Sequence, residues 1–141
     1  MAERFKFEKK NWYPHMKPAD VLIWEKFIDK NPDYYDECEY DVPVGPGAPA
    51  DPRVNEETEG DINALYQKKI DVVGFGDKQI DVVEVKPNAG SSAVGQVKYY
   101  KKLYLEDFKP RDEVFAVIVT NAVRPGMAEF CKAEGVVLLV V

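Results

Sequence analysis

Several residue types and patterns are scarce in this 141-residue chain, and each scarcity excludes a class of protein. It has two cysteines, Cys38 and Cys131, without the paired spacing that a disulfide framework or a zinc site requires. No apolar run approaches the roughly 18 residues of a transmembrane helix. The N-terminal segment MAERFKFEKK is too charged for a secretory signal peptide. We therefore expect a cytoplasmic protein in a reducing setting.

The chain also lacks the basic excess that is usual in nucleic-acid-binding proteins, since its net charge is −6. Its 45% apolar and 31% charged composition is ordinary for a globular protein. The length of 141 residues predicts one domain over residues 1–141. Acidic residues concentrate in 33–41 and 51–61. Six lysines lie in or directly after the stretch described next and are expected to gather around its candidate site: Lys68, Lys69, Lys86, Lys98, Lys101 and Lys102. A local basic rim can bind phosphates, but weakly and in a salt-sensitive way.

The stretch from Lys68 to Tyr100 contains the most informative pattern. Two β-rich runs, 68–73 and 80–86, flank a Gly- and Asp-containing connection and predict an antiparallel hairpin. Alternation along the second run places one set of side chains on one face (Ile80, Val82, Glu84, Lys86) and another on the opposite face (Asp81, Val83, Val85). Glu84 and Lys86 then lie side by side at the strand's end, within reach of Asp71.

Two carboxylates that converge on one point repel each other unless a cation lies between them, and Mg²⁺ prefers such oxygen ligands. A lysine beside them can hold a phosphate oxygen or orient a water molecule. The combination suits hydrolysis of a phosphodiester. The alternative is a hairpin that ends in a solvated Glu–Lys pair without chemistry.

Asp71, Glu84-Val85-Lys86 and the downstream Gln96-x-x-x-Tyr100 resemble the PD-(D/E)xK nuclease superfamily, which has the restriction-endonuclease-like fold. The Gln-x-x-x-Tyr helix resembles the RecB-like and lambda-exonuclease-like branches. The sequence departs from the pattern at Ile70, where many members have proline. The resemblance implies a deoxyribonuclease dependent on Mg²⁺ or Mn²⁺. The size is similar to that of small phage and mobile-element nucleases and junction resolvases, so a homodimer or a larger phage or repair complex would fit.

The resemblance also implies roles for individual residues. Asp71, Glu84 and the backbone carbonyl of Val85 would bind the metal, and Lys86 would complete the catalytic set. Gln96 and Tyr100 would position DNA, and we expect Lys98 and Lys69 to contact it as well. The family often places a further acid on its first helix. Glu25, on the border of the apolar stripe between Val21 and Ile28, is the candidate, although such an acid is more often a solvated flank. His15, the single histidine, is more typical of a surface or packing residue than of a ligand.

The remaining elements follow from periodicity and punctuation. We expect a helix from Pro18 to Asn31, a strand at 39–44 that Pro43 makes an edge or ends early, a helix from Ser91 or Ser92 to about Tyr104, a buried strand at 113–120, a helix at 122–133 and a buried strand at 136–141. The order α-β-β-β-α-β-α-β predicts an α/β fold with a mixed sheet. Residues 45–60 predict an exposed loop, either a substrate lid or an ordinary insertion. A module that keeps the fold without cleaving remains the alternative function, because the chain is acidic.

Overall fold

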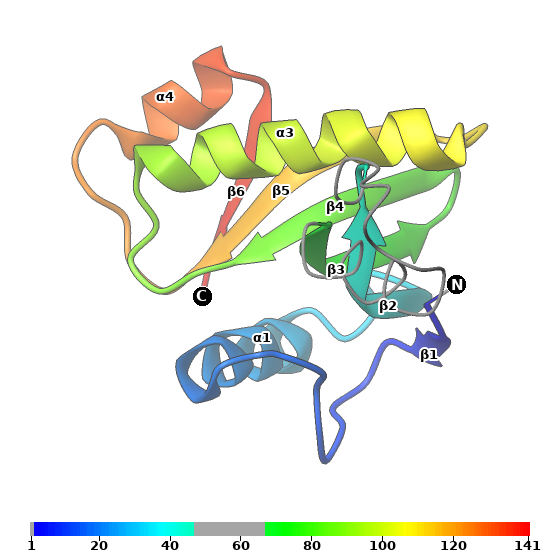
Figure 1. The fold of residues 1–141 in the computed structure, drawn as a ribbon. Coiled ribbons are helices and arrows are strands. Elements are labelled where there is room, and N and C mark those ends of the chain that lie inside the picture. The colour runs from blue at the N-terminus through cyan, green and yellow to red at the C-terminus, as the bar shows by residue number, and fades with distance from the viewer. Residues whose placement is uncertain (1, 47–66) are drawn as a thin grey trace, which may run out of the picture.

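The computed structural model describes residues 2–46 and 67–141 as one mixed sheet with helices on both faces (Figure 1). In chain order the elements are β1 (Arg4–Lys6), α1 (Pro18–Lys30), β2 (Glu37–Val44), β3 (Lys68–Gly76), β4 (Gln79–Val85), α3 (Ser91–Phe108), β5 (Glu113–Thr120), α4 (Met127–Ala133) and β6 (Val136–Val140). The predicted α/β class and mixed sheet are confirmed, and β1 is an addition that the sequence analysis did not predict.

The six strands lie in the order β1-β2-β3-β4-β5-β6. Pairs from β1 to β4 are antiparallel, whereas β4–β5 and β5–β6 are parallel. The predicted hairpin is β3–β4, joined by a two-residue turn at Asp77 and Lys78. Lys78 has a φ of 55°, a left-handed conformation that suits the tight connection. Parallel neighbours need a crossover, which α3 and α4 provide.

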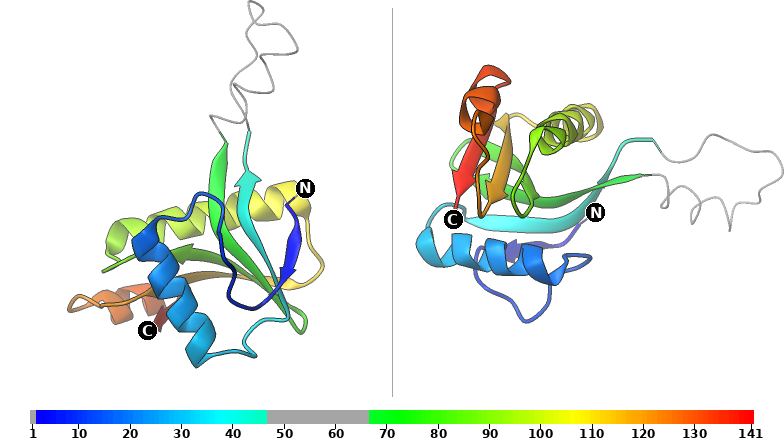
Figure 2. Two further views of the ribbon diagram at one scale, coloured as in Figure 1. Left: turned by 90° about the horizontal axis from the view of Figure 1, so that it is seen from below. Right: turned by 90° about the vertical axis from the view of Figure 1, so that its left-hand side faces the viewer.

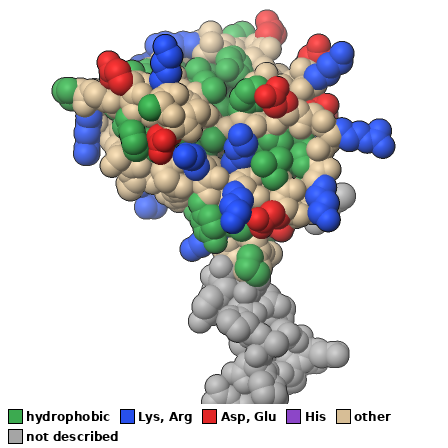
Figure 3. Space-filling view, turned by 90° about the horizontal axis from the view of Figure 1, so that it is seen from above, with side chains coloured by type: hydrophobic (Ala, Val, Ile, Leu, Met, Phe, Trp, Pro, Cys, Tyr) green, Lys and Arg blue, Asp and Glu red, His purple; other side chains and the backbone are tan. Residues whose placement is uncertain are grey.

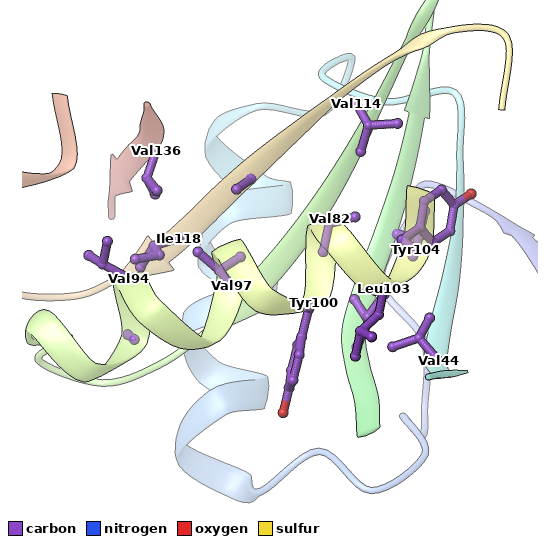
Figure 4. Packing of buried hydrophobic residues seen from close by; sticks show 14 of the residues in the cluster. Val44, Val82, Val94, Val97, Tyr100, Leu103, Tyr104, Val114, Ile118 and Val136 are labelled. Carbon is purple, nitrogen blue, oxygen red and sulfur yellow. The ribbon is translucent and has the colours of Figure 1, made fainter. Parts of the chain in front are cut away.

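Apolar side chains form one core on each face of the sheet, and Figure 2 shows the helices that cover them. On one face the rings of Trp24 and Phe27 from α1 pack against residues of β2, β4 and β5. On the other face α3 and α4 cover the sheet, and Figure 4 shows Val94, Val97 and Leu103 of α3 lying over the strands. The alternation predicted along β4 is confirmed, because Ile80 and Val82 join the α3 core while Val83 and Val85 join the α1 core.

Several predicted boundaries were wrong for local reasons. The helix expected at 122–133 begins only at Met127, since Gly126 has a φ of 84° and forms the N-cap. Gly90, rather than a serine, is the N-cap of α3, and no side chain caps it. β6 is an edge strand with Val140 half exposed, not a buried strand, because among the described residues only β5 pairs with it.

β2 continues through Pro43 to Val44 instead of ending early. Pro43 pairs with Lys69 of β3, whereas β1 pairs with β2 only at residues 37–39. No described strand lies on the outer side of β2 at Pro43, so its missing N–H leaves no unpaired ladder partner there. The predicted loop at 45–60 lies outside the described residues apart from its first two positions. Among the described helices, none has both the length and the apolar character needed to cross a bilayer.

A candidate active site at the end of β4

Three acids occupy one row across three neighbouring strands. The pairs Tyr40↔Val72 and Val42↔Ile70 of β2 and β3 place Asp41 opposite Asp71. One step beyond the last pair of β3 and β4, Val72↔Val83, the same register brings Asp71 opposite Glu84. Adjacent strands lie about 4.8 Å apart, and like charges directly opposite each other destabilise a sheet. Such an arrangement is therefore electrostatically unfavourable by itself.

At this row the side chains of β2 and β3 switch from one core of the sheet to the other. Tyr40 and Val72 belong to the α1 core, whereas Val42 and Ile70 belong to the α3 core. Residues two apart normally share a face, so each strand must twist sharply between them. Asp41 has a φ of 53°, a left-handed conformation that aspartate tolerates better than most residues. At this row the pairing of β3 with β4 ends, whereas β2 and β3 continue to pair as far as Val44 and Lys68.

The carboxylate of Asp71 bridges β3 and β4 where their regular pairing ends. Its Oδ2 accepts a hydrogen bond from the backbone N–H of Val85 at 3.0 Å. Along its other edge, β4 pairs with β5 as far as Val85. The bond satisfies a backbone donor and holds the Asp71 side chain beside Glu84.

Glu84 is 6% exposed, and burial together with the charge of Asp71 raises its pKa to about 8. Burial likewise raises the pKa of Asp71 to about 6, although its hydrogen bond from Val85 opposes the shift. Lys86 lowers both pKa values. Two neighbouring acids whose ionisation is disfavoured by burial and by each other form a site that a cation would stabilise.

A fourth acid, Asp20 in the first turn of α1, acts on the same pair. Its charge raises the pKa of both Asp71 and Glu84. Burial raises the pKa of Asp20 itself, while Lys17 and Lys86 lower it. In the sequence Asp20 has the ordinary position of an acid in the first turn of a helix, where its charge is favourable. The sequence contains no signal that α1 starts opposite the end of β4, so only the fold identifies this residue.

Glu25, the helix acid that the sequence analysis selected, has a different partner. Its Oε2 accepts a hydrogen bond from the hydroxyl of Tyr13 at 3.1 Å, and that hydroxyl also accepts one from the backbone N–H of Lys10. Glu25 thus holds the segment that precedes α1. His15 is largely exposed and lies 3.4 Å from a carboxylate oxygen of Asp41, at the border of the acidic row.

Gln96 and Tyr100 approach the acids from α3. The amide of Gln96 donates to the Tyr100 hydroxyl at 2.8 Å, and Figure 4 shows that hydroxyl at the far end of a ring extending from α3 beyond the apolar side chains. Burial raises the pKa of Tyr100, as do the charges of Glu84 and Asp71. Tyr100 is therefore close enough to the acidic pair to feel its charge, and Gln96 joins it through their hydrogen bond.

The predicted lysines are placed less uniformly. Lys86 is exposed at the end of β4 and acts on the three acids Asp20, Asp71 and Glu84. Lys98 lies 3.5 Å from Glu134, so it points toward the C-terminal end of α4. Lys69 is exposed on β3 opposite Pro43. Figure 3 shows basic and acidic side chains intermixed over the face formed by α3 and α4, so this face is not a continuous basic surface.

The acids fit a divalent metal only as a pair. Across residues 2–46 and 67–141, no three histidine, cysteine, aspartate or glutamate side chains are gathered closely enough to form a ligand group. Asp71 and Glu84 nevertheless supply hard oxygen ligands. Burial raises the pKa of both carboxyl groups, and a bound cation would favour their ionised forms. Mg²⁺ is commonly held by one or two carboxylates together with water and substrate phosphates. The residues present fit that mode of binding.

The fold is one that repair endonucleases also adopt. One solved structure with it is a repair endonuclease from Pyrococcus abyssi, with a TM-score of 0.51 and 19% identity over 94% of this chain. Another is EndoMS in complex with double-stranded DNA, with a TM-score of 0.51 and 17% identity over the same share. The chain spans 49% and 48% of the lengths of these two proteins. No protein-family model and no curated protein matches the sequence.

Proposed function

We propose that this chain is a metal-dependent nuclease of the PD-(D/E)xK type that hydrolyses phosphodiester bonds in DNA. The observation that supports it most is the buried Asp71–Glu84 pair, with raised pKa values of about 6 and about 8, beside Lys86 at the end of β4. A structural ion pair would not require two acids to oppose each other there. The shared fold with two endonucleases, one of them bound to duplex DNA, supports DNA as the substrate.

Asp71, Glu84 and the carbonyl of Val85 would hold Mg²⁺ or Mn²⁺, with Asp20 adding negative charge nearby. The metal supplies Lewis-acid stabilisation of phosphoryl charge and an acidified water. Lys86 is exposed at the end of β4 and lowers the pKa of both acids, so its ammonium group would contact a phosphate oxygen or orient the attacking water. The bond from Val85 to Asp71 keeps one carboxylate in place while the rest of the site accepts substrate.

Gln96 and Tyr100 orient the DNA backbone. Their mutual hydrogen bond holds the tyrosine hydroxyl on the α3 side of the site, where the charges of Glu84 and Asp71 raise its pKa. The Gln-x-x-x-Tyr spacing supports assignment to the RecB-like or lambda-exonuclease-like branch. We expect Gln96→Ala to slow cleavage while Mn²⁺ affinity changes less than about threefold, because Gln96 contacts Tyr100 rather than the acids. Calorimetric titration of Mn²⁺ beside a cleavage assay checks this, and a parallel loss of metal binding would make Gln96 part of the ligand set.

The decisive experiment compares metal binding and cleavage in one preparation. Linear, nicked and branched DNA are incubated with Mg²⁺, Mn²⁺, Ca²⁺ or EDTA, and Mn²⁺ binding is measured by calorimetry. Cleavage is expected with Mg²⁺ and Mn²⁺, and none is expected with EDTA or with Ca²⁺, whose looser coordination positions reactants less well. Glu84→Gln should abolish cleavage and Mn²⁺ binding together. Failure of the wild-type chain to bind Mn²⁺ at millimolar concentration would reject the proposal.

A second candidate is a module that keeps this fold and binds nucleic acid or protein without cleaving. It is favoured by the net charge of −6 and by the absence of a gathered three-acid group among the described residues. Mn²⁺ binding separates the two, because an inert module has no use for the metal. A homodimer or a phage or repair complex is compatible with either candidate, and the oligomeric state follows from sedimentation of the same preparation.

A further inference from the structure

Trp12 lies in the segment between β1 and α1, and its side chain is 70% exposed. The other tryptophan, Trp24, is fully buried in the α1 core. A single exposed aromatic residue is common on protein surfaces and indicates nothing by itself. The contacts made by the neighbours of Trp12 distinguish it from such a residue.

The neighbouring residue holds this segment in one conformation. Tyr13 is 4% exposed and packs edge-on against Tyr40 at 5.3 Å between ring centroids. Its hydroxyl accepts a bond from the backbone N–H of Lys10 and donates one to Glu25. Burial raises the pKa of Tyr13 to about 12, so the hydroxyl keeps its proton. Trp12 is thus presented next to a fixed anchor, and little conformational freedom is lost when it binds a ligand.

The same segment runs along the acidic row. His15 reaches Asp41, and the charge of Lys17 acts on Asp20, so both ends of residues 15–17 adjoin the candidate active site. Figure 2 shows this segment on the same side of the sheet as α1. Trp12 is three residues from His15, which limits their Cα separation to about 11 Å. Three nucleotides along one strand of a duplex span about the same distance.

The segment is locally basic on an acidic chain. Residues 9–17, KKNWYPHMK, contain three lysines and no aspartate or glutamate, whereas the whole chain carries a net charge of −6. Lys9 pairs with Asp29 of α1 at 2.9 Å, and the ammonium group of Lys10 lies over the Phe5 ring. An exposed indole in a lysine-containing segment is suited to single-stranded nucleic acid, since lysines attract the backbone and the ring stacks on a base. A fully paired, stacked base exposes no face to such a ring.

We propose that residues 9–17 form a wall of the DNA-binding site and that Trp12 stacks on an unpaired base close to the cleaved bond. The inference rests on the proposed nuclease function and adds a preference to it. Substrates with a single-stranded or unpaired nucleotide beside the scissile phosphate are favoured over fully paired duplex. Glu25, through Tyr13, is a positioning residue for this wall.

The two tryptophans provide an internal test, because only Trp12 is accessible. Wild-type protein in Ca²⁺ is titrated with a single-stranded oligonucleotide, with the corresponding duplex, and with a duplex that contains one unpaired base. Tryptophan emission should fall with the first and third ligands and change little with the second. Trp12→Phe should bind within about threefold of wild type without this quenching, since phenylalanine still stacks and Trp24 stays buried.

Trp12→Ala should weaken binding of the single strand about 5- to 150-fold, which corresponds to one lost base stack. Leu22→Ala is the matched control, because Leu22 is 71% exposed on α1 and should leave binding unchanged. The inference is overturned if wild type binds and cleaves DNA while Trp12→Ala binds equally well or binding causes no quenching. If the wild-type protein neither binds nor cleaves any of the three ligands, the proposed function fails and this inference fails with it.

Discussion

Asp71 and Glu84 are two acids placed where each makes the other harder to ionise. Burial raises the pKa of both, and Asp41 and Asp20 add further negative charge to Asp71. Proteins commonly tolerate such local destabilisation where a ligand or a reaction requires it. At the residue scale, the metal-free protein should therefore be less stable than its packing alone would make it.

This repulsion predicts a pH dependence of stability for the metal-free protein. Glu84 ionises near 4.5 when unfolded and at about 8 when folded. Between these values the folded state holds a proton that the unfolded state has released, so the free energy of unfolding falls as pH rises. Glu84→Gln should flatten this slope above about pH 6 and raise the free energy of unfolding at pH 8 by about 0.5–2 kcal/mol.

Denaturant unfolding in EDTA at several pH values measures this effect. Glu113→Gln serves as the control, because Glu113 is exposed at the opposite end of the parallel strands, and its substitution should leave the slope unchanged. A Glu84→Gln protein that is less stable than wild type at every pH would show that Glu84 is a structural partner of Lys86.

Helix α1 contains two acids, Asp20 and Glu25, either of which could support metal binding at the candidate site. Asp20 adds charge to the Asp71–Glu84 pair, whereas Glu25 accepts a hydrogen bond from Tyr13. Asp20→Asn should weaken Mn²⁺ binding about 10-fold or more, the usual effect of removing a charge that supports a metal ligand set. Glu25→Gln should leave Mn²⁺ affinity within about threefold. Calorimetric titration of both variants decides the matter, and a larger effect at Glu25 would restore it as the metal-site acid.

At the scale of elements, β3 depends on a glycine to accommodate the segment after α1. The Tyr35 ring lies against Gly74, where a Cβ atom would come within 2.6 Å of it, and the Tyr35 hydroxyl donates to Asp81 at 2.6 Å. Asp81 is 1% exposed, and its other oxygen accepts a bond from Gln79. The bare backbone at Gly74 thus allows a buried carboxylate in β4 to be fully paired.

Two glycine substitutions should therefore have opposite signs. Gly74→Ala forces a methyl group into the packed Tyr35 ring and should lower the free energy of unfolding by about 1–3 kcal/mol. Gly95→Ala, in the exposed interior of α3 with no atom near the new methyl group, should raise it by about 0.5–1 kcal/mol. Denaturant unfolding of both variants measures the difference. Equal destabilisation by the two would mean that Gly74 does not support the Tyr35 contact.

At the scale of the whole molecule, the proposed function requires an acidic chain to bind a polyanion through a small basic region. The net charge is −6, and the described basic side chains near the site are few, with Lys86 and Lys17 acting directly on its acids. DNA affinity should therefore depend on a few local contacts and decline with salt.

If about three phosphates are contacted, log affinity should fall with log salt at a slope of about −2.7, and binding should weaken about 40-fold between 50 and 200 mM salt. Fluorescence anisotropy of a labelled oligonucleotide over this range gives the slope. Lys86→Gln should reduce its magnitude by about one unit if Lys86 contacts a phosphate. Lys30→Gln, at the far end of α1, is the control and should leave the slope unchanged. A slope near zero would exclude phosphate contacts as the source of affinity.

The amino-acid sequence by itself determined the class of fold and the alternation of side chains along β4. Alternation placed Glu84 with Ile80 and Val82, the continuous apolar run of β5 required cover on both faces, and proline and asparagine marked the limits of α1. These features are local, because a side chain's face depends only on the period of its own element. The Gln96–Tyr100 contact follows from helical spacing in the same way.

Only the tertiary structure decided which other acids lie near Asp71 and Glu84. Asp20 lies near the candidate site because α1 begins opposite the end of β4, and Asp41 does so because β2 twists there. Neither placement follows from the periodicity of a helix or a strand, so neither can be predicted from the sequence. The same reason explains why Glu25 lies with Tyr13. An acid's position along its helix is a local property, whereas its distance from an acid on another element depends on how the packed layers are placed.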